Sequence, residues 1–192
     1  MRSMKKFGVL AVVVFALSAI GAANASAAQF TASATGSITG KALETQEFTI
    51  NAGTIRCPIA ETSGPITSSP SSEQQAHVTY KNCTAFASFV PVHNITADYV
   101  FTANGTVHIA QTITITVTAP FKTCHVTVGP QPVGTVDYAN NGAGNGILIT
   151  PTVTGISYSS TGDLCGKSGT NGTYKGVNEV TRVGGGFFRY DK

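Results

Sequence analysis

The stretch Gln111-Thr-Ile-Thr-Ile-Thr-Val-Thr118 decides the fold class of this chain of 192 residues. Its isoleucines and valine alternate strictly with threonines. Alternation with a period of two predicts a β-strand, because successive side chains leave opposite faces of the strand. We expect the apolar face to be buried and the threonine face to be solvated. Cys124 follows the turn signal Ala119-Pro120, so this strand should lead directly into a neighbour anchored by a disulfide.

The rest of the chain also predicts β-structure. Short strand-like segments recur about every 8 to 12 residues, with turn signals between them and no helical period, which is typical of a sandwich or barrel. We predict an all-β fold, a single antiparallel β-sandwich or barrel-like domain of about ten strands. A division into two smaller sheets near Pro120 stays open, because each half of the chain holds two cysteines.

Turn chemistry predicts the local boundaries. Asn104-Gly105 and Asn51-Ala52-Gly53 predict hairpins, since asparagine and glycine tolerate positive φ angles. Serine, threonine and proline predict a loop at Thr62–Gln75. Further expectations are a turn at Ile38–Gly40, strands at Ala85–Val92, Ile147–Ile149, Val153–Tyr158 and Tyr174–Val183, and a loop at Gly166–Gly172.

The N-terminal segment predicts export. Arg2, Lys5 and Lys6 precede an uncharged apolar run, and Ala23-Asn-Ala-Ser-Ala27 offers signal peptidase an Ala-x-Ala site. The run is shorter than the roughly 20 apolar residues that cross a bilayer. We therefore expect residues 1–27 to be a cleaved signal peptide and residues 28–192 to be a secreted, extracellular domain.

Removing this segment changes the charge of the protein. The chain has 12 basic and 9 acidic residues, and loss of the three signal cations leaves nine of each. A neutral domain has no electrostatic surface for phosphate backbones or anionic lipid. We therefore expect neither nucleic acid nor, for the mature form, a membrane as a partner.

Four widely spaced cysteines in an exported chain predict two disulfides. Cys57, Cys83, Cys124 and Cys165 allow three connectivities, and we favour Cys57 with Cys83 and Cys124 with Cys165 because each closes a local segment. Zinc sites usually bring cysteines in close pairs, and this spacing has none. The cysteines therefore predict no metal site.

Several motifs along the chain carry a family resemblance; they are Gly40-Lys-Ala-Leu-x-Thr-Gln-x-Phe48, Ala52-Gly-Thr-Ile-x-Cys57, Val78-Thr-Tyr-x-x-Cys-x-Ala-Phe86, Cys124-x-Val-x-Val-x-x-Gln131, Val136-x-Tyr-x-Asn140, Val153-Thr-Gly-Ile-x-Tyr158, Cys165 and Gly172-Thr-Tyr-x-Gly176. In these motifs the chain resembles a group of uncharacterised exported β-rich proteins of soil actinobacteria, which have no known activity. The resemblance implies export and the fold but no site. Members often carry a further cysteine pair where this chain has Ala97 and Ile109.

Motifs of the common enzyme classes are missing from the sequence. It contains no Gly-x-Ser-x-Gly, phosphate loop or His-Glu-x-x-His. The sequence does not exclude a triad of His77 or His108 with Asp98 and a serine, but no motif supports one. The nine acidic residues predict no facing pair. We expect no enzyme, no cofactor and no catalytic residue.

Binding is the stronger alternative. Five tyrosines recur along the predicted strands and could stack on sugar rings, although a strand tyrosine is equally an ordinary core residue with a polar tip; they are Tyr80, Tyr99, Tyr138, Tyr158 and Tyr174. The threonine row of the opening stretch raises ice binding, which would need several aligned rows. The Phe187–Tyr190 tail is either an added strand for self-association or a frayed end.

These patterns favour a non-catalytic extracellular or cell-surface domain with a structural or interaction role. The alternative is a module that binds carbohydrate or a cell-envelope polymer. An unrecognised secreted hydrolase is the third hypothesis.

Overall fold

The computed structural model describes residues 27–86 and 90–192, so the predicted signal peptide lies, except for Ala27, outside the described residues. The described residues form seventeen β-strands. Within these ranges no helix is long and apolar enough to cross a membrane. The predicted all-β fold is confirmed.

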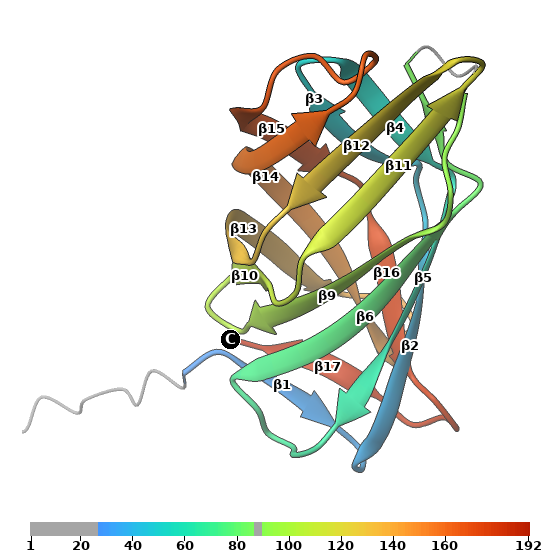
Figure 1. Cartoon of the computed structure of the whole chain (residues 1–192). Helices are drawn as coiled ribbons and strands as arrows, with labels where there is room; N and C mark the ends of the chain where they lie inside the picture. Colours follow the sequence, from blue (N-terminus) through green and yellow to red (C-terminus); the bar gives the residue numbers. More distant parts are fainter. Residues whose placement is uncertain (1–26, 87–89) are drawn as a thin grey trace, which may run out of the picture.

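Eight strands close into an antiparallel barrel, which lies below a second sheet in Figure 1. Around the barrel each strand pairs with the next, and the pairing of the first with the last closes the circle. In that order the strands are β13 (Gln131–Asn140), β10 (Thr106–Ile109), β9 (Ile95–Thr102), β6 (Glu73–Lys81), β5 (Ile59–Ile66), β2 (Gly36–Ala42), β16 (Asn178–Arg182) and β14 (Gly146–Thr161).

The long strand β14 belongs to both sheets. Up to Thr152 it pairs with β13 and β16, and from Val153 it pairs with strands of the second sheet. Pro151, which has no N–H to donate, lies at this change of partner. Besides β14, the second sheet contains in order β11 (Ile113–Ala119), β12 (Lys122–Val128), β15 (Gly169–Lys175), β3 (Gln46–Ile50), β4 (Gly53–Cys57), β7 (Thr84–Ala85) and β8 (Val90–Pro91).

A bridge between Val92 and Val117 joins the end of the second sheet back to β11. The strands on either side of Pro120 pair with each other as a hairpin. The division between the sheets therefore runs through β14, and the alternative that placed it near Pro120 is wrong.

Two terminal strands cap the lower end of the barrel in Figure 1, where β1 (Gln29–Ala32) pairs with β17 (Phe188–Asp191). Phe30 and Phe188 are both 2% exposed, and the Phe30 ring meets the Tyr138 ring edge-on at 5.2 Å. The expectation of a frayed C-terminus is wrong, because the tail pairs with the N-terminal strand of its own chain.

Alternation and turn signals located several elements correctly. In β11 the three aliphatic side chains are buried, and β11 pairs along its whole length with β12, the predicted disulfide-anchored neighbour. The hairpins at Asn104-Gly105 and at Asn51-Ala52-Gly53 are confirmed by the pairings of β9 with β10 and of β3 with β4. Of the predicted strand at Ala85–Val92, residues 87–89 lie outside the described ranges.

Other boundaries were wrong where glycine or polar residues lie within strands. Ile38–Gly40 belongs to β2, and β5 and β6 take up most of the predicted loop Thr62–Gln75. A Cβ on Gly64 would overlap the backbone of Gln75, so this glycine permits a close strand approach instead of a turn. Residues 147–149 and 153–158, predicted as two strands, form one strand, β14. The predicted strand Tyr174–Val183 is divided between β15 and β16, and β15 begins at Gly169, inside the predicted loop. Strand residues in the predicted turn and loops and the division of Tyr174–Val183 raise the number of strands above the expected ten, whereas the merging into β14 lowers it.

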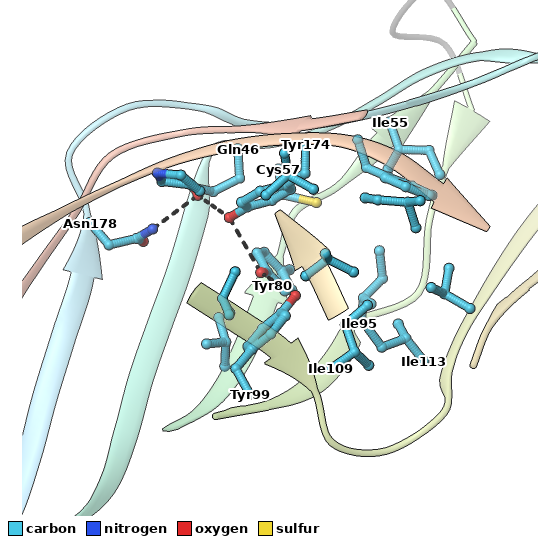
Figure 2. A pocket seen from close by; sticks show the side chains of 18 of the residues that line it. Gln46, Ile55, Cys57, Tyr80, Ile95, Tyr99, Ile109, Ile113, Tyr174 and Asn178 are labelled. Carbon is cyan, nitrogen blue, oxygen red and sulfur yellow. Dashed lines mark hydrogen bonds between the residues drawn. The ribbon is translucent and has the colours of Figure 1, made fainter. Parts of the chain in front are cut away.

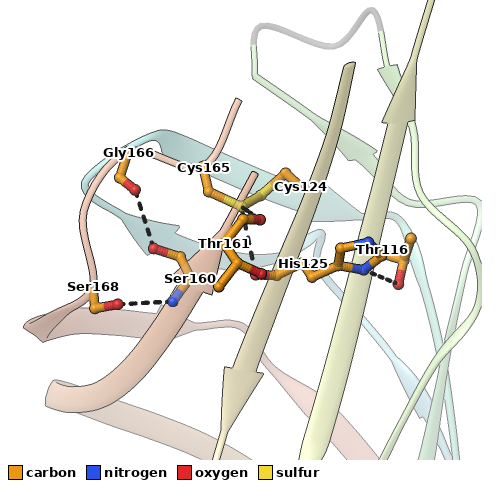
Figure 3. The surroundings of a disulfide bond; sticks show 8 residues. All are labelled: Thr116, Cys124, His125, Ser160, Thr161, Cys165, Gly166 and Ser168. Atoms are coloured by element: carbon orange, nitrogen blue, oxygen red, sulfur yellow. Dashed lines mark hydrogen bonds between the residues drawn. A yellow bond between two sulfur atoms is a disulfide. The ribbon is translucent and has the colours of Figure 1, made fainter. Parts of the chain in front are cut away.

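The favoured disulfide pairing is confirmed. Cys57 and Cys83 have Cα atoms 4.1 Å apart, and those of Cys124 and Cys165 are 5.0 Å apart. All four cysteines are at most 4% exposed. Figure 3 shows that Cys165 joins the loop after β14 to β12, and that Ser160 holds the same loop through the carbonyl of Gly166 at 3.2 Å.

Candidate functional site

The five tyrosines predicted as ligand contacts do not share one surface. Tyr80, Tyr99 and Tyr174 meet inside the molecule, whereas Tyr138 lies on β13 against Phe30 of the cap and Tyr158 lies in the second sheet. Tyr80 is 6% exposed and Tyr158 is 5% exposed. These two therefore offer no open ring face on which a polysaccharide could stack.

The three interior tyrosines form a hydrogen-bonded chain (Figure 2). The Tyr80 hydroxyl lies 3.0 Å from that of Tyr99 and donates to that of Tyr174 at 3.3 Å. Tyr174 in turn donates to Oε1 of Gln46. The chain therefore connects β9, β6, β15 and β3, and it spans the boundary between the two sheets.

Gln46 anchors this chain. It is 1% exposed, and its Nε2 donates to the carbonyl of Glu44 at 2.7 Å and to that of Val177 at 3.3 Å. Its Oε1 also accepts a hydrogen bond from Nδ2 of Asn178 at 3.2 Å. Sequence reasoning missed Gln46 and Asn178. The sequence does contain one signal for them. Each lies two residues from an apolar residue of its strand, so its side chain points to the same inward face.

Burial keeps the interior tyrosines neutral. It raises the pKa of Tyr174 to about 12 and also raises the pKa values of Tyr80 and Tyr99 well above their ordinary value. A buried phenol that stays protonated at physiological pH donates hydrogen bonds and supplies no base. The cluster can therefore orient a ligand, but it has no group poised to accept a proton.

A cavity of about 100 Å³ lies beside this chain, between the barrel and the second sheet. Its wall is mostly aliphatic and contains no charged side chain. Figure 2 shows the polar cluster at one side and the aliphatic residues around the rest. Representative lining residues are Ile55, Val78, Ile95, Ile109, Ile113 and Val153.

An outer groove of about 210 Å³ adjoins the cavity, and Pro151 lines both. Glu47 in this groove lies between two cations of neighbouring strands, 2.9 Å from Arg56 Nε and 2.9 Å from Lys175 Nζ. The hydrogen bond from Lys175, together with that from Arg56, lowers the pKa of Glu47 and outweighs the effect of burial. The negative charge of Glu47 is therefore balanced by two neighbouring side chains. We interpret Glu47, Arg56 and Lys175 as a structural ion-pair network.

The serine, histidine and aspartate of a triad do lie in one row on the outer face of the barrel. His77 Nδ1 is 2.7 Å from Asp98 Oδ1, and Ser63 is in register with His77 on the other side. Both members of the histidine–aspartate pair are solvent-exposed, at 49% and 34%. A triad normally works in a water-excluded site with an oxyanion hole, so this geometry favours a cross-strand hydrogen bond on the surface.

The remaining polar features have structural explanations. Asn141 Oδ1 accepts from the backbone amides of Asn145 at 3.1 Å and Gly146 at 3.2 Å, which accounts for the Asn/Gly loop as a turn. Over residues 27–86 and 90–192 no group of three His, Cys, Asp or Glu side chains could hold a metal ion.

The threonine face of β11 forms only a broken array. Thr114 and Thr118 lie opposite Thr127 and Thr123, but Thr116 lies opposite His125 and is 3.2 Å from its Nδ1. A lattice match needs an uninterrupted repeat, so we assign this face to ordinary solvent contact.

Comparisons with family models, with curated proteins and with solved structures find no match to this chain. The resemblance to exported actinobacterial proteins therefore stays a prediction, and the function must be argued from the geometry above.

Proposed function

We propose that the mature chain acts outside the cell as a non-catalytic domain with a structural or interaction role. The observation that carries this proposal is the pair of buried disulfides, each of which closes a segment of the fold. Disulfides form and persist in oxidising compartments, and they are compatible with an extracellular location.

The closed barrel supports the same proposal. Each of its eight strands pairs with a neighbour on both sides, so the barrel offers no row of free backbone groups to another chain. A partner of the barrel would then be recognised by side chains and surface shape.

Binding of an envelope polymer is the alternative role, and a pull-down tests it. The purified protein is incubated with cell-wall material and insoluble polysaccharides, with a Cys57→Ser/Cys83→Ser variant as the fold control. Retention that the control loses would establish a binding module. No retention on any polymer would leave the structural role as the working proposal.

A hydrolase is the second candidate, and the row of Ser63, His77 and Asp98 is the observation that favours it. Turnover of small activated esters by the unaltered protein, lost in both Ser63→Ala and His77→Ala, would contradict the non-catalytic proposal. We expect neither turnover nor labelling of Ser63 by a fluorophosphonate, because the histidine and aspartate of the row are open to solvent. A Ser159→Ala variant serves as the matched surface control.

A further inference from the structure

The turn of the β11–β12 hairpin presents an aromatic ring to the solvent. Ala119 pairs with Lys122, so Pro120 and Phe121 form a two-residue turn between the strands. The Phe121 side chain is fully exposed, at 104% of its reference area. Leaving so large an apolar surface in water is unfavourable. The ring therefore adds nothing to the core and is available to a partner.

The backbone at Phe121 also opposes an aromatic residue. Its φ angle is +65°, in the left-handed region that glycine and asparagine adopt readily and bulky side chains rarely adopt. Two-residue hairpin turns prefer glycine or asparagine at such positions. An exposed ring has no packing to offset this strain, so the stability of the fold does not account for it. Strained residues of this kind cluster at functional sites.

The hairpin holds the ring rigidly. Strands β11 and β12 pair along their whole length up to the turn. Next to the turn, Val117 and Cys124 are both 0% exposed, and Cys124 is bonded to Cys165. The loop after β14 packs against the same place, since a Cβ on Gly162 would overlap the carbonyl of Thr123. A ring fixed in this way loses little conformational entropy when it binds.

The charges around the turn favour an anionic partner. The turn lies at the upper end of the second sheet in Figure 1. Lys122 follows the ring, and the loop beside it contains Asp163 and Lys167. Within the described residues none of these three side chains takes part in an ion pair. This end of the molecule therefore presents two lysines and one carboxylate beside the ring.

The isolation of the ring favours a bilayer over a protein pocket. A stable protein interface buries roughly 1,200 Å² or more around its anchor residues. The other exposed large apolar side chains of the described residues lie on or next to barrel strands and cannot extend such a surface; they are Leu43, Ile59 and Val183. A bilayer needs no complementary shape, because it takes up an aromatic ring at its interface and a lysine among its head groups.

We propose that Phe121 inserts into the surface of a bilayer that contains anionic phospholipid, with Lys122 at the head groups. The contact is shallow and reversible, because one ring buries less apolar surface than a single myristoyl chain, which itself binds reversibly. The expectation that the mature chain has no membrane partner rests on its net charge, which does not describe a local apolar contact. The inference goes beyond the proposed role and does not depend on polymer binding.

Vesicle flotation of the unaltered protein tests the contact. One set of vesicles is phosphatidylcholine alone, and the other is phosphatidylcholine and phosphatidylglycerol in equal parts. We expect half of the protein to bind the mixed vesicles at on the order of 1 mM lipid. Binding to phosphatidylcholine alone should be about tenfold weaker, because the lysines then meet no net negative charge.

A Phe121→Asn variant separates binding from stability. It should bind the mixed vesicles at least about tenfold more weakly, and its urea midpoint should rise because asparagine suits the left-handed turn. Val183→Asn, which removes an exposed apolar side chain next to the barrel, is the matched control and should bind like the unaltered protein. A lowered urea midpoint in Phe121→Asn would instead assign the ring a structural role.

Fluorescence then reports where the ring lies. The chain has no tryptophan, so Phe121→Trp introduces a single fluorophore at the turn. Its emission should shift to the blue with mixed vesicles and be quenched by brominated lipid, whereas Val183→Trp should show neither effect. Equal flotation of Phe121→Asn and the unaltered protein would overturn the turn as the contact. No flotation with either kind of vesicle would overturn the membrane assignment and leave a protein pocket as the partner of the ring.

Discussion

Replacing Gly176 with alanine tests the packing of the polar wall. Gly176 lies between β15 and β16 and does not have a positive φ, so alanine is compatible with its backbone. A Cβ at this position would lie 2.5 Å from Cδ and 2.6 Å from Nε2 of Gln46, and closer still to its Oε1. Gln46 must therefore move if Gly176 gains a methyl group.

The hydrogen bonds of Gln46 set the magnitude. The amide is held by the carbonyls of Glu44 and Val177, by Tyr174 and by Asn178, and displacing it sacrifices at least two of these bonds. Each contributes about 1 kcal/mol, and a buried group left without a partner adds more. Overpacking itself is destabilising by about 1–3 kcal/mol. We expect Gly176→Ala to lower the free energy of unfolding by about 3 kcal/mol.

A double-mutant cycle with Gln46→Ala separates the clash from any other effect. In the Gln46→Ala background the obstacle is gone, so Gly176→Ala should be neutral or stabilise by up to about 1 kcal/mol through the unfolded chain. Urea denaturation of the four proteins gives the coupling. Gly142→Ala, with no atom within 4 Å of the new Cβ, is the matched control and should change stability by less than about 0.5 kcal/mol. An equal loss in both backgrounds would refute the clash with Gln46.

Three further predictions follow from burial, charge and connectivity. The pKa of Tyr174 is higher in the folded state than its ordinary value of 10, so the neutral hydroxyl stabilises the fold below pH 10, and about 3 kcal/mol is lost as the pH rises from 10 to 12. Urea midpoints across this range should fall less steeply in Tyr174→Phe. Replacing both cysteines of a disulfide with serine should lower the free energy of unfolding by about 3.5 kcal/mol for the pair separated by 26 residues and by about 4 kcal/mol for the pair separated by 41, measured by urea denaturation; a loss under about 1 kcal/mol would contradict the loop-closure argument. The lowered pKa of Glu47 means that its ion pairs stabilise the fold above its unfolded pKa and are lost as the pH falls through the folded value. Glu47→Gln should therefore lower the free energy of unfolding by about 1 kcal/mol at pH 7 and by progressively less as the pH falls below 4.5, measured by thermal denaturation.

The sequence predicted correctly those elements that depend on a few adjacent residues. Strict alternation placed β11, and Asn104-Gly105 placed its hairpin, because each depends on a few adjacent residues. The cysteine pairing could also be predicted from the sequence. Each disulfide closes a segment of the chain that its hairpins already fold back on itself.

The closure of the barrel could not be predicted from the sequence in the same way. It depends on pairings between strands distant in sequence, such as β2 with β16, whose register no local pattern specifies. Strand β5 was missed because its outer face is polar and its inner face includes Gly64, a composition that also suits loops. The candidate site was missed for a related reason. A single glutamine or asparagine among the inward-facing positions of a strand can be recognised as part of a polar cluster only when its buried hydrogen-bond partners are known.

The change of partner along β14 links the fold to the polar cluster around Gln46. Where β15 and β16 part, the carbonyl of Val177 accepts a hydrogen bond from the backbone amide of Leu43 at 2.8 Å and a second one from Nε2 of Gln46 at 3.3 Å. Because a carbonyl only accepts, Gln46 turns its own oxygen inward. That oxygen accepts from Tyr174 and Asn178. The parting of the two strands therefore sets the direction of the hydrogen bonds in the cluster, so Gly176→Ala, which displaces Gln46, should act on the whole cluster.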